Sequence, residues 1–217
     1  QQHMHHADSK AHKQKLLEHH LESGQLFKSL VFTATKRGAE QVAKVLRGKN
    51  LKSAALHGDM SQNKRRQTVE NLRKGRIDTL VATDVAARGL DITDISHVLN
   101  YDLPTVAEDY IHRIGRTGRA SATGCAISLV GPADWKKLSQ IEKRIGQKVK
   151  REVVDGLEPS SGEPSTASKP KRNAKPRHKF GKGAKGAKSA STRKPGSWRK
   201  AQSGSKQSKS ARIRKAA

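Results

Sequence analysis

Residues 29–56 read SLVFTATKRGAEQVAKVLRGKNLKSAAL, and this stretch decides the fold class. Residues 29–34 form a short apolar run of the length that suits a buried strand. Between residues 38 and 49 the apolar side chains recur at helical spacing, which is typical of a helix with one buried face. Residues 51–56 form a second short apolar run. The stretch therefore predicts a strand, a helix and a second strand.

The same alternation continues along the chain. We expect a helix with Ser61 as its N-cap, strands over 78–82 and 97–101, a helix over 106–114, a strand over 125–130 and a helix over 133–145. Strands that alternate with helices in this way predict an α/β fold, in which a parallel sheet is covered by helices on both faces. In such sheets ligands bind at the carboxyl ends of the strands, so we expect the loops that follow the strands to carry the function.

The charge of the chain separates a domain from a tail. The 217 residues contain 45 Lys and Arg against 19 Asp and Glu, which gives a formal net charge of +26. Residues 158–217 hold 18 of these basic residues and 2 of the acidic ones, with very few large apolar side chains. Such a segment cannot bury enough apolar surface to offset the entropy lost on ordering. We therefore expect one domain over 10–157, beginning with a helix over 10–21, an interdomain linker over 1–9 and a disordered basic tail over 158–217.

The tail has two possible functions. It could simply keep the protein soluble, but its excess of cations favours a flexible arm that binds RNA without sequence preference. In that arm Phe180 and Trp198 could stack on bases. The overall charge likewise favours a polyanionic partner, with nucleic acid as the leading candidate.

Several classes of protein are excluded by composition. No stretch approaches the ~18 apolar residues needed to span a bilayer, so we expect no membrane association. The single cysteine, Cys125, cannot form an internal disulfide, and we interpret it as a small buried residue in a reducing, cytoplasmic compartment. The histidines near the start, such as His3, His5 and His20, have no accompanying set of carboxylates or cysteines, and we expect no metal site there.

One group of residues that could carry chemistry is HRIGRTGR over 112–119. Its three arginines are costly to place beside an apolar sheet unless an anion lies there, and the planar guanidinium suits phosphate oxygens. Its two glycines allow the chain to turn tightly beside a ligand. An ordinary basic loop remains the alternative.

Two further groups directly follow predicted strands. In VATDVAARGLDI over 81–92, Thr83 could donate to a phosphate and Asp91 could bind a ribose hydroxyl, whereas Asp84 could simply cap the next turn. In HGDMSQNKRR over 57–66, a glycine and a helix start offer N–H groups to an anion, and Gln62 and Arg65 lie one turn apart. A surface helix with a basic patch is the competing interpretation of the second group.

Taken in order, four segments resemble helicase motifs. Residues 30–37 (LVFTATKR), 57–65, 81–92 and 112–119 are similar to motif IV, the QxxR element, motif V and motif VI. Their order and spacing resemble the C-terminal RecA-like domain of DEAD-box ATP-dependent RNA helicases over roughly residues 10–155. The basic tail is similar to those of bacterial RhlE- and SrmB-like members of that family.

The resemblance implies a role for each matching residue. Arg116 and Arg119 match the arginine fingers that contact the γ-phosphate of ATP across the interdomain cleft. His112 and Arg113 match residues that tie ATP hydrolysis to interdomain contacts, and we count all four as catalytic. The remaining matches are Gly89 and Asp91 at the nucleotide, where Asp91 contacts the ribose, and the RNA-backbone positions Thr35, Arg37, Gly58, Gln62, Arg65 and Thr83.

The chain departs from the full family pattern. It contains no GxxxxGK[ST] phosphate loop and no Asp-Glu-Ala-Asp box, and its one Ser-Ala-Thr string, at 121–123, directly follows the 112–119 segment and so does not stand where the family's Ser-Ala-Thr motif would, upstream of the segments above. In the family these belong to a first RecA-like domain, so the resemblance implies that ATP with Mg is bound mainly by an upstream domain of the parent chain. We expect the 217 residues alone to be inactive. A non-catalytic RNA-binding module and a DNA-directed helicase remain alternatives, and ribosomal or RNA-degradation assemblies are further candidate partners.

Overall fold

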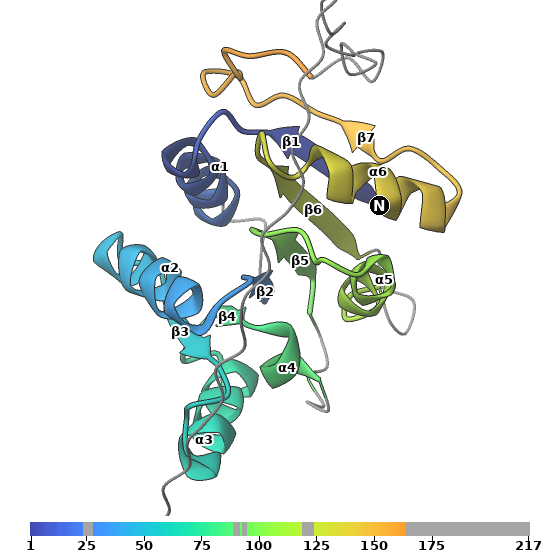
Figure 1. Cartoon of the computed structure of the whole chain (residues 1–217). Coiled ribbons are helices and arrows are strands. Elements are labelled where there is room, and N and C mark those ends of the chain that lie inside the picture. Colours follow the sequence, from blue (N-terminus) through green and yellow to red (C-terminus); the bar gives the residue numbers. More distant parts are fainter. Residues whose placement is uncertain (24–27, 89–91, 93–94, 119–123, 164–217) are drawn as a thin grey trace, which may run out of the picture. The chain divides into compact units, whose positions relative to one another are not determined.

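The computed structural model of the chain describes residues 1–23, 28–88, 92, 95–118 and 124–163 (Figure 1). One compact unit covers Gln1–Ser168. The predictions for the tail, including those for Phe180 and Trp198, concern residues outside the described part.

A sheet of seven strands, in the order β3-β4-β2-β5-β6-β1-β7, forms the centre of the domain. Every pair of neighbouring strands is parallel, and Leu30 of β2 pairs with Leu80 of β4 and with Val98 of β5. The strands are β1 (Gln2–His6), β2 (Ser29–Phe32), β3 (Ser53–Leu56), β4 (Thr79–Ala82), β5 (His97–Asn100), β6 (Cys125–Val130) and β7 (Lys150–Arg151).

Helices cover both faces of this sheet, as the sequence predicts. The helices are α1 (Lys10–Glu22), α2 (Lys36–Gly48), α3 (Gln62–Arg73), α4 (Asp84–Ala87), α5 (Ala107–Ile114) and α6 (Trp135–Ile145). Because successive side chains of a strand point to opposite faces, neighbouring residues of β2 enter different cores. Val31 packs with α1 and α2 on one face, whereas Leu30 packs with α3 and α4 on the other. Along β1, Met4 packs with α5 and α6 in a third cluster.

Side-chain caps determine where α2 and α3 begin. The Thr35 hydroxyl accepts a hydrogen bond from Gly38 N at 2.9 Å and so caps the N-terminus of α2. The predicted N-cap of α3 is confirmed, since the Ser61 hydroxyl accepts from Lys64 N at 3.4 Å. These two caps fix the direction in which the chain leaves β2 and β3, and so they position the loops at the carboxyl ends of those strands.

The predicted linker over 1–9 is wrong. Residues 2–6 form β1, which lies between β6 and β7 inside the sheet. The sequence concealed this strand because three of its five residues are histidines, and His5 takes a buried position next to α1 where an apolar residue would normally indicate a strand. The short β7 was not predicted either, because its two residues are both charged and exposed.

The predicted domain boundary at 157 is also too early. The backbone N–H groups of Ser160 and Ser161 donate to the Asp8 carboxylate at 2.7 and 3.0 Å, and Glu163 pairs with Arg151 at 2.9 Å. The serine hydrogen bonds hold the pKa of Asp8 well below its usual range. Residues 158–163 therefore belong to the domain.

Cys125 is less buried than its sequence context suggests. Its side chain is half-buried against the core, and the Sγ atom lies 2.9 Å from His3 Nε2. Burial raises the pKa of the thiol.

Two histidine rings meet between β1 and α1. His5 Nε2 lies 3.0 Å from His20 Nε2, and His5 Nδ1 lies 2.9 Å from the Glu152 carbonyl oxygen. Since a carbonyl can only accept, His5 donates from Nδ1, and with a neutral His5 ring its Nε2 then accepts from His20 Nε2–H. The His5 ring is neutral in this arrangement. Burial is the largest cause, and the nearby His5 the second, of a pKa of His20 that is lowered to about 4. Burial also lowers the pKa of His5.

We expect this pair to make the domain acid-sensitive. In the unfolded chain both histidines take up protons near pH 6.5, whereas in the folded domain they stay neutral to lower pH. The unfolded state therefore binds more protons in this window, and stability is lost as the pH falls from about 6.5 to about 4. In urea titrations, we expect His20→Gln to remove about 2 kcal/mol of the difference in unfolding free energy between pH 7.5 and pH 4.5. His19→Gln, at the exposed neighbouring position, is the control, and equal pH dependence in both variants would refute the assignment.

Candidate functional site

Three of the predicted segments meet at one edge of the sheet. The strands β3, β4 and β2 are neighbours, and their carboxyl ends lead into residues 57–59, 83 and 33–37, respectively. Thr35, Gly58 and Thr83 therefore belong to one surface although they are far apart in the sequence. The loops that the sequence singled out therefore lie together at the carboxyl ends of the strands.

At this surface the Thr35 side chain is used within the domain, whereas Gly58 leaves open space. The Thr35 hydroxyl is used in capping α2, and a Cβ added to Gly38 would lie 3.0 Å from it, so this turn favours glycine at position 38. A Cβ added to Gly58 would meet only Lys36 Cε at 3.8 Å. Packing among the described residues therefore does not require a glycine at position 58, and another chain has room to approach there.

Arg65 joins two helices at the same edge. Its Nη2 donates to the Ala86 carbonyl at 3.2 Å, and its Nη1 donates to Gln62 Oε1 at 3.4 Å. Its Nε is buried and has no hydrogen-bond partner. The predicted pair of Gln62 and Arg65 is thus brought into contact, and Arg65 also holds α4 against α3.

Thr83 lies at the junction of β4 and α4. It occupies the N-cap position of the short helix, yet its side chain makes no capping hydrogen bond. The sequence left open that Asp84 simply caps the following turn, but its carboxylate is used elsewhere. Its carboxylate accepts two hydrogen bonds from the Arg113 guanidinium, at 2.7 Å from Nε and 2.8 Å from Nη2.

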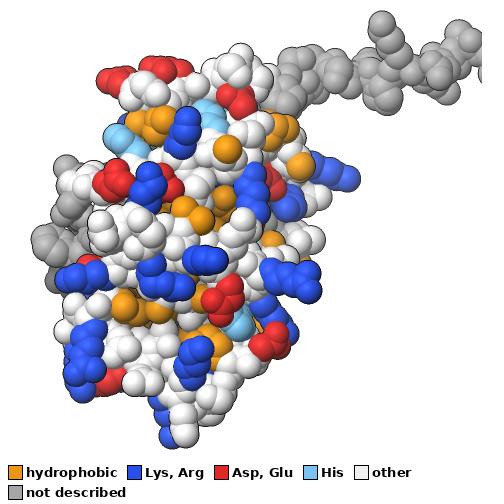
Figure 2. All heavy atoms as spheres, turned by 90° about the vertical axis from the view of Figure 1, so that its left-hand side faces the viewer, with side chains coloured by type: hydrophobic (Ala, Val, Ile, Leu, Met, Phe, Trp, Pro, Cys, Tyr) orange, Lys and Arg blue, Asp and Glu red, His pale blue; other side chains and the backbone are white. Residues whose placement is uncertain are grey.

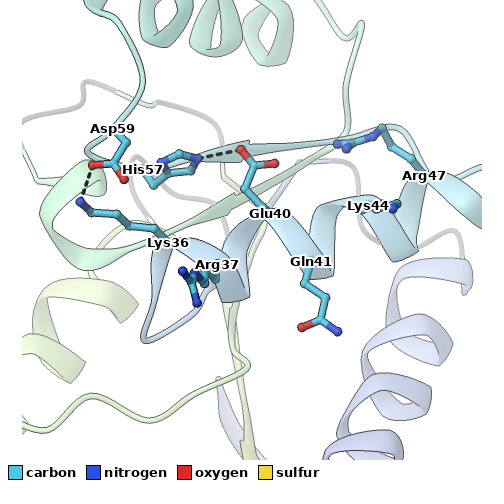
Figure 3. A pocket seen from close by; sticks show the side chains of 8 residues that line it. All are labelled: Lys36, Arg37, Glu40, Gln41, Lys44, Arg47, His57 and Asp59. Atoms are coloured by element: carbon cyan, nitrogen blue, oxygen red, sulfur yellow. Dashed lines mark hydrogen bonds and ion pairs between the residues drawn. The ribbon is translucent and has the colours of Figure 1, made fainter.

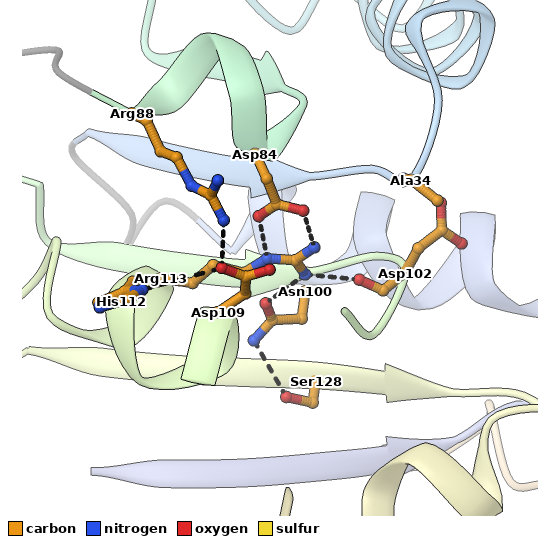
Figure 4. Close-up of polar contacts among 9 residues, drawn as sticks. All are labelled: Ala34, Asp84, Arg88, Asn100, Asp102, Asp109, His112, Arg113 and Ser128. Atoms are coloured by element: carbon orange, nitrogen blue, oxygen red, sulfur yellow. Dashed lines mark hydrogen bonds and ion pairs between the residues drawn. The ribbon is translucent and has the colours of Figure 1, made fainter. Parts of the chain in front are cut away.

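Arg113 lies inside the domain (Figure 4). Besides Asp84, its Nη1 donates to Asn100 Oδ1 at 2.9 Å and to the Asp102 carbonyl at 2.7 Å. The guanidinium also lies over the Phe32 ring, with 4.8 Å between the guanidinium carbon and the ring centroid. The residue is 2% exposed.

This placement corrects the catalytic role that the sequence suggested for Arg113. Four of the five N–H groups of a guanidinium are occupied by these bonds, so the side chain cannot reach a ligand outside the domain. Instead it ties α5 to α4 and to β5. We assign Arg113 a positioning role.

His112 and Arg116, from the same motif, lie at the surface. The His112 side chain is 70% exposed, with Nδ1 3.8 Å from Asp109 Oδ1, and Asp109 also pairs with Arg88. Arg116 follows the end of α5 and is half-buried. With Arg88, Asp109, His112 and Arg113, it lines a hollow of about 20 Å³.

The hollow is far too small to enclose a nucleotide, but its charges suit phosphate. The carboxylates of Asp84 and Asp109 are each paired with an arginine, and the lining holds three arginines against these two carboxylates, so the rim is cationic overall. The described residues therefore fit one wall of a phosphate site rather than a complete pocket. Gly89, Asp91 and Arg119 lie outside the described residues.

Two contributors, the buried Asn100 and the partly exposed Asp102, were not found by the sequence analysis. Asn100 closes β5 and links Arg113 to Ser128, whose hydroxyl accepts from Asn100 Nδ2 at 3.2 Å. The Asp102 carboxylate accepts from Ala34 N at 2.9 Å and fixes the loop after β2. A polar residue that ends an apolar strand, as Asn100 does, is a usable signal of such a contributor, because a buried polar group needs hydrogen-bond partners.

Neither a metal cluster nor a membrane span is present in the part of the chain that the structure describes. There, no three His, Cys, Asp or Glu side chains are arranged to hold a metal ion. None of the described helices is long and apolar enough to cross a bilayer.

Comparison with known proteins identifies the domain. Residues 12–121 match the family described as the helicase conserved C-terminal domain, which is half of the chain. The chain belongs to this family. Its motifs and fold are those of the C-terminal RecA-like domain of DEAD-box RNA helicases, as its similarity to individual members also shows.

Two bacterial helicases illustrate the similarity. This helicase domain is 43% identical over 159 residues to the ATP-dependent RNA helicase SrmB of Haemophilus influenzae, covering 73% of the chain and 36% of the relative. It is 53% identical over 122 residues to the DEAD-box ATP-dependent RNA helicase RhpA of Helicobacter pylori, covering 56% of the chain and 25% of the relative. The chain thus spans about a third or less of the length of these relatives.

Solved structures agree with the RecA-like fold. The E. coli DEAD-box protein SrmB, in its complex with regulator of ribonuclease activity A, is similar with a TM-score of 0.74 and 41% identity, over 76% of this chain and 96% of that one. The C-terminal domain of the DEAD-box protein Dbp5 gives a TM-score of 0.65 and 35% identity, over 70% of this chain and 88% of that one. The predicted RecA-like α/β fold is confirmed.

Proposed function

We propose that this chain is the second RecA-like domain of an ATP-dependent RNA helicase. It would supply arginine fingers for ATP hydrolysis and half of a groove for the RNA backbone. The observation that carries this proposal is that two arginines of the 112–119 segment differ in position. Arg113 is bound to partners inside the domain, whereas Arg116 lies at a cationic rim.

The nucleotide would lie between this rim and an upstream RecA-like domain of the same parent chain. ATP, when bound with Mg, supplies the bond whose hydrolysis drives the cycle. Arg116 and Arg119 would stabilise negative charge on the transferred phosphoryl group, and Gly89 and Asp91 would lie at the nucleotide, with Asp91 at the ribose. His112, which is exposed beside Asp109, would contact the upstream domain.

The RNA would follow the carboxyl ends of β2, β3 and β4. Arg37 and Arg65 would meet phosphates there, while Gly58 leaves room for the strand to approach. Thr35, Gln62 and Thr83 complete the set of predicted contacts. Contacts to phosphates and sugars position a strand without reading its sequence. Closure of the two domains on RNA would bend the strand and separate short duplexes, and reopening would follow hydrolysis.

The basic tail extends this proposal. Its 18 cations against 2 anions favour a sequence-tolerant arm for RNA, with Phe180 and Trp198 as stacking residues. Such an arm would hold the helicase near large RNAs, including ribosomal or RNA-degradation assemblies in the cytoplasm. The name of one solved relative, SrmB bound to regulator of ribonuclease activity A, supports a link with RNA degradation.

Hydrolysis of ATP by the 217 residues alone tests the division between the two domains. We expect binding of single-stranded RNA without ATP turnover, because the sequence contains no phosphate loop and no Asp-Glu-Ala-Asp box. The control is the same sequence joined to its upstream RecA-like domain, which should hydrolyse ATP. RNA-stimulated turnover by the 217 residues alone would overturn the proposal.

A further inference from the structure

A second hollow lies beside α2 (Figure 3). It measures about 490 Å³ and is lined by one side of α2 and by the loop that follows β3. Arg37, a predicted RNA contact, lies at the N-terminal end of this wall, whereas Lys44 and Arg47 lie further along the helix. None of the motif resemblances involves Lys44 or Arg47.

The acidic groups of this hollow are already paired. Asp59 forms an ion pair with Lys36, which lowers the pKa of that carboxyl, and Glu40 Oε1 lies 2.7 Å from His57 Nε2. The remaining cations have few partners of their own. Among the described residues Arg37 and Lys44 make no hydrogen bond or ion pair, and Arg47 only donates from Nη1 to the Ser53 carbonyl at 3.3 Å.

The face around the hollow is basic as well. Figure 2 looks onto the side of the domain on which α1, α2 and α3 lie, and Lys and Arg side chains predominate over acidic ones there. A polyanion that approaches this face therefore meets a favourable potential before it reaches the hollow.

The spacing of the free cations suits a strand of nucleic acid. Arg37 and Lys44 are seven residues apart, which places them on the same side of α2 and about 10 Å apart along its axis. One stacked nucleotide rises about 3.4 Å, so this distance corresponds to about three nucleotides. The two side chains would therefore contact different phosphates of one strand.

We propose that single-stranded RNA leaves the predicted groove at Arg37 and continues along α2, with Lys44 and Arg47 binding its phosphates. This inference rests on the proposed function, because the strand must first occupy the groove at β2, β3 and β4. It adds a subsite of about three nucleotides to the RNA footprint of the domain.

The test compares two lengths of RNA bound by the full 217-residue chain. The variant is Lys44→Gln with Arg47→Gln, and the matched control is Lys136→Gln with Lys143→Gln, which removes the same charge from exposed positions of α6. Arg65→Ala reports on the groove itself. Affinities are measured across a salt series for single-stranded RNAs of about 6 and about 12 nucleotides.

We expect the α2 variant to bind the longer RNA about tenfold more weakly at 0.1 M salt and to lower its logarithmic salt slope by about 1.4, while the shorter RNA is hardly affected. The α6 control should change neither. Equal losses in the α2 and α6 variants, or equal losses on both RNAs, would refute the subsite. If Arg65→Ala weakens both RNAs and the α2 variant weakens neither, only the subsite fails. If Arg65→Ala also has no effect, the proposed RNA groove fails with it.

Discussion

Replacing Arg116 or Arg119 with alanine in the parent helicase should lower ATP turnover by about 10³- to 10⁵-fold. Arg116 lies at the rim of the domain, just after the end of α5, and under the proposed function it would face a nucleotide bound by the upstream domain. An arginine finger stabilises charge that develops in the transition state, so its loss should lower kcat while RNA affinity remains unchanged. Steady-state turnover under saturating RNA and ATP measures the effect.

The control for this experiment is Arg144→Ala. Arg144 lies on α6 and pairs with Glu108 at the surface, at 3.0 Å, so its removal deletes an arginine without touching the rim. Its turnover should remain normal. Near-normal turnover in both Arg116→Ala and Arg119→Ala would contradict the assignment of these residues as fingers.

Replacing Arg113 should instead destabilise the domain, by about 3–5 kcal/mol. Its guanidinium is 2% exposed and holds Asp84, Asn100 and the Asp102 carbonyl together. Arg113→Met keeps much of the volume but leaves the Asp84 carboxylate and the Asn100 amide without their partner. Urea unfolding of the 217-residue chain measures the change in free energy.

A double-mutant cycle separates this effect from lost packing. In Arg113→Met with Asp84→Leu both charges are absent, so the loss should be clearly smaller than in Arg113→Met alone. The surface variant Arg144→Ala should cost less than about 1 kcal/mol. A loss in Arg113→Met no larger than that of Arg144→Ala would contradict the positioning role.

Much of the fold could be predicted because apolar side chains dominate its central strands. The runs at 29–34 and 125–130 become β2 and β6, since buried parallel strands are apolar on both faces. The strand at 2–6 could not be predicted in the same way. Its buried histidine, His5, is paired with His20 of α1 and with the Glu152 carbonyl, and a pattern of apolar residues does not reveal such a position.

The candidate site was only partly predictable, for a related reason. The string over 112–119 presents its arginines as equivalent, although Arg113 is buried and Arg116 is not. Helical spacing contains a hint, because Arg113 follows Tyr110 by one turn and Tyr110 is fully buried. Helical spacing cannot identify the partners of Arg113, because Asp84 and Asn100 belong to other elements and approach it only when the sheet has formed.

ATP turnover by the parent polypeptide, with its upstream domain included, tests the central claim most directly. It should be measured without nucleic acid, with single-stranded RNA and with DNA of matched sequence. The account predicts that RNA stimulates turnover and that DNA does not. Turnover that is equally stimulated by DNA, or that is absent under all three conditions, would contradict the assignment of this domain to an ATP-dependent RNA helicase.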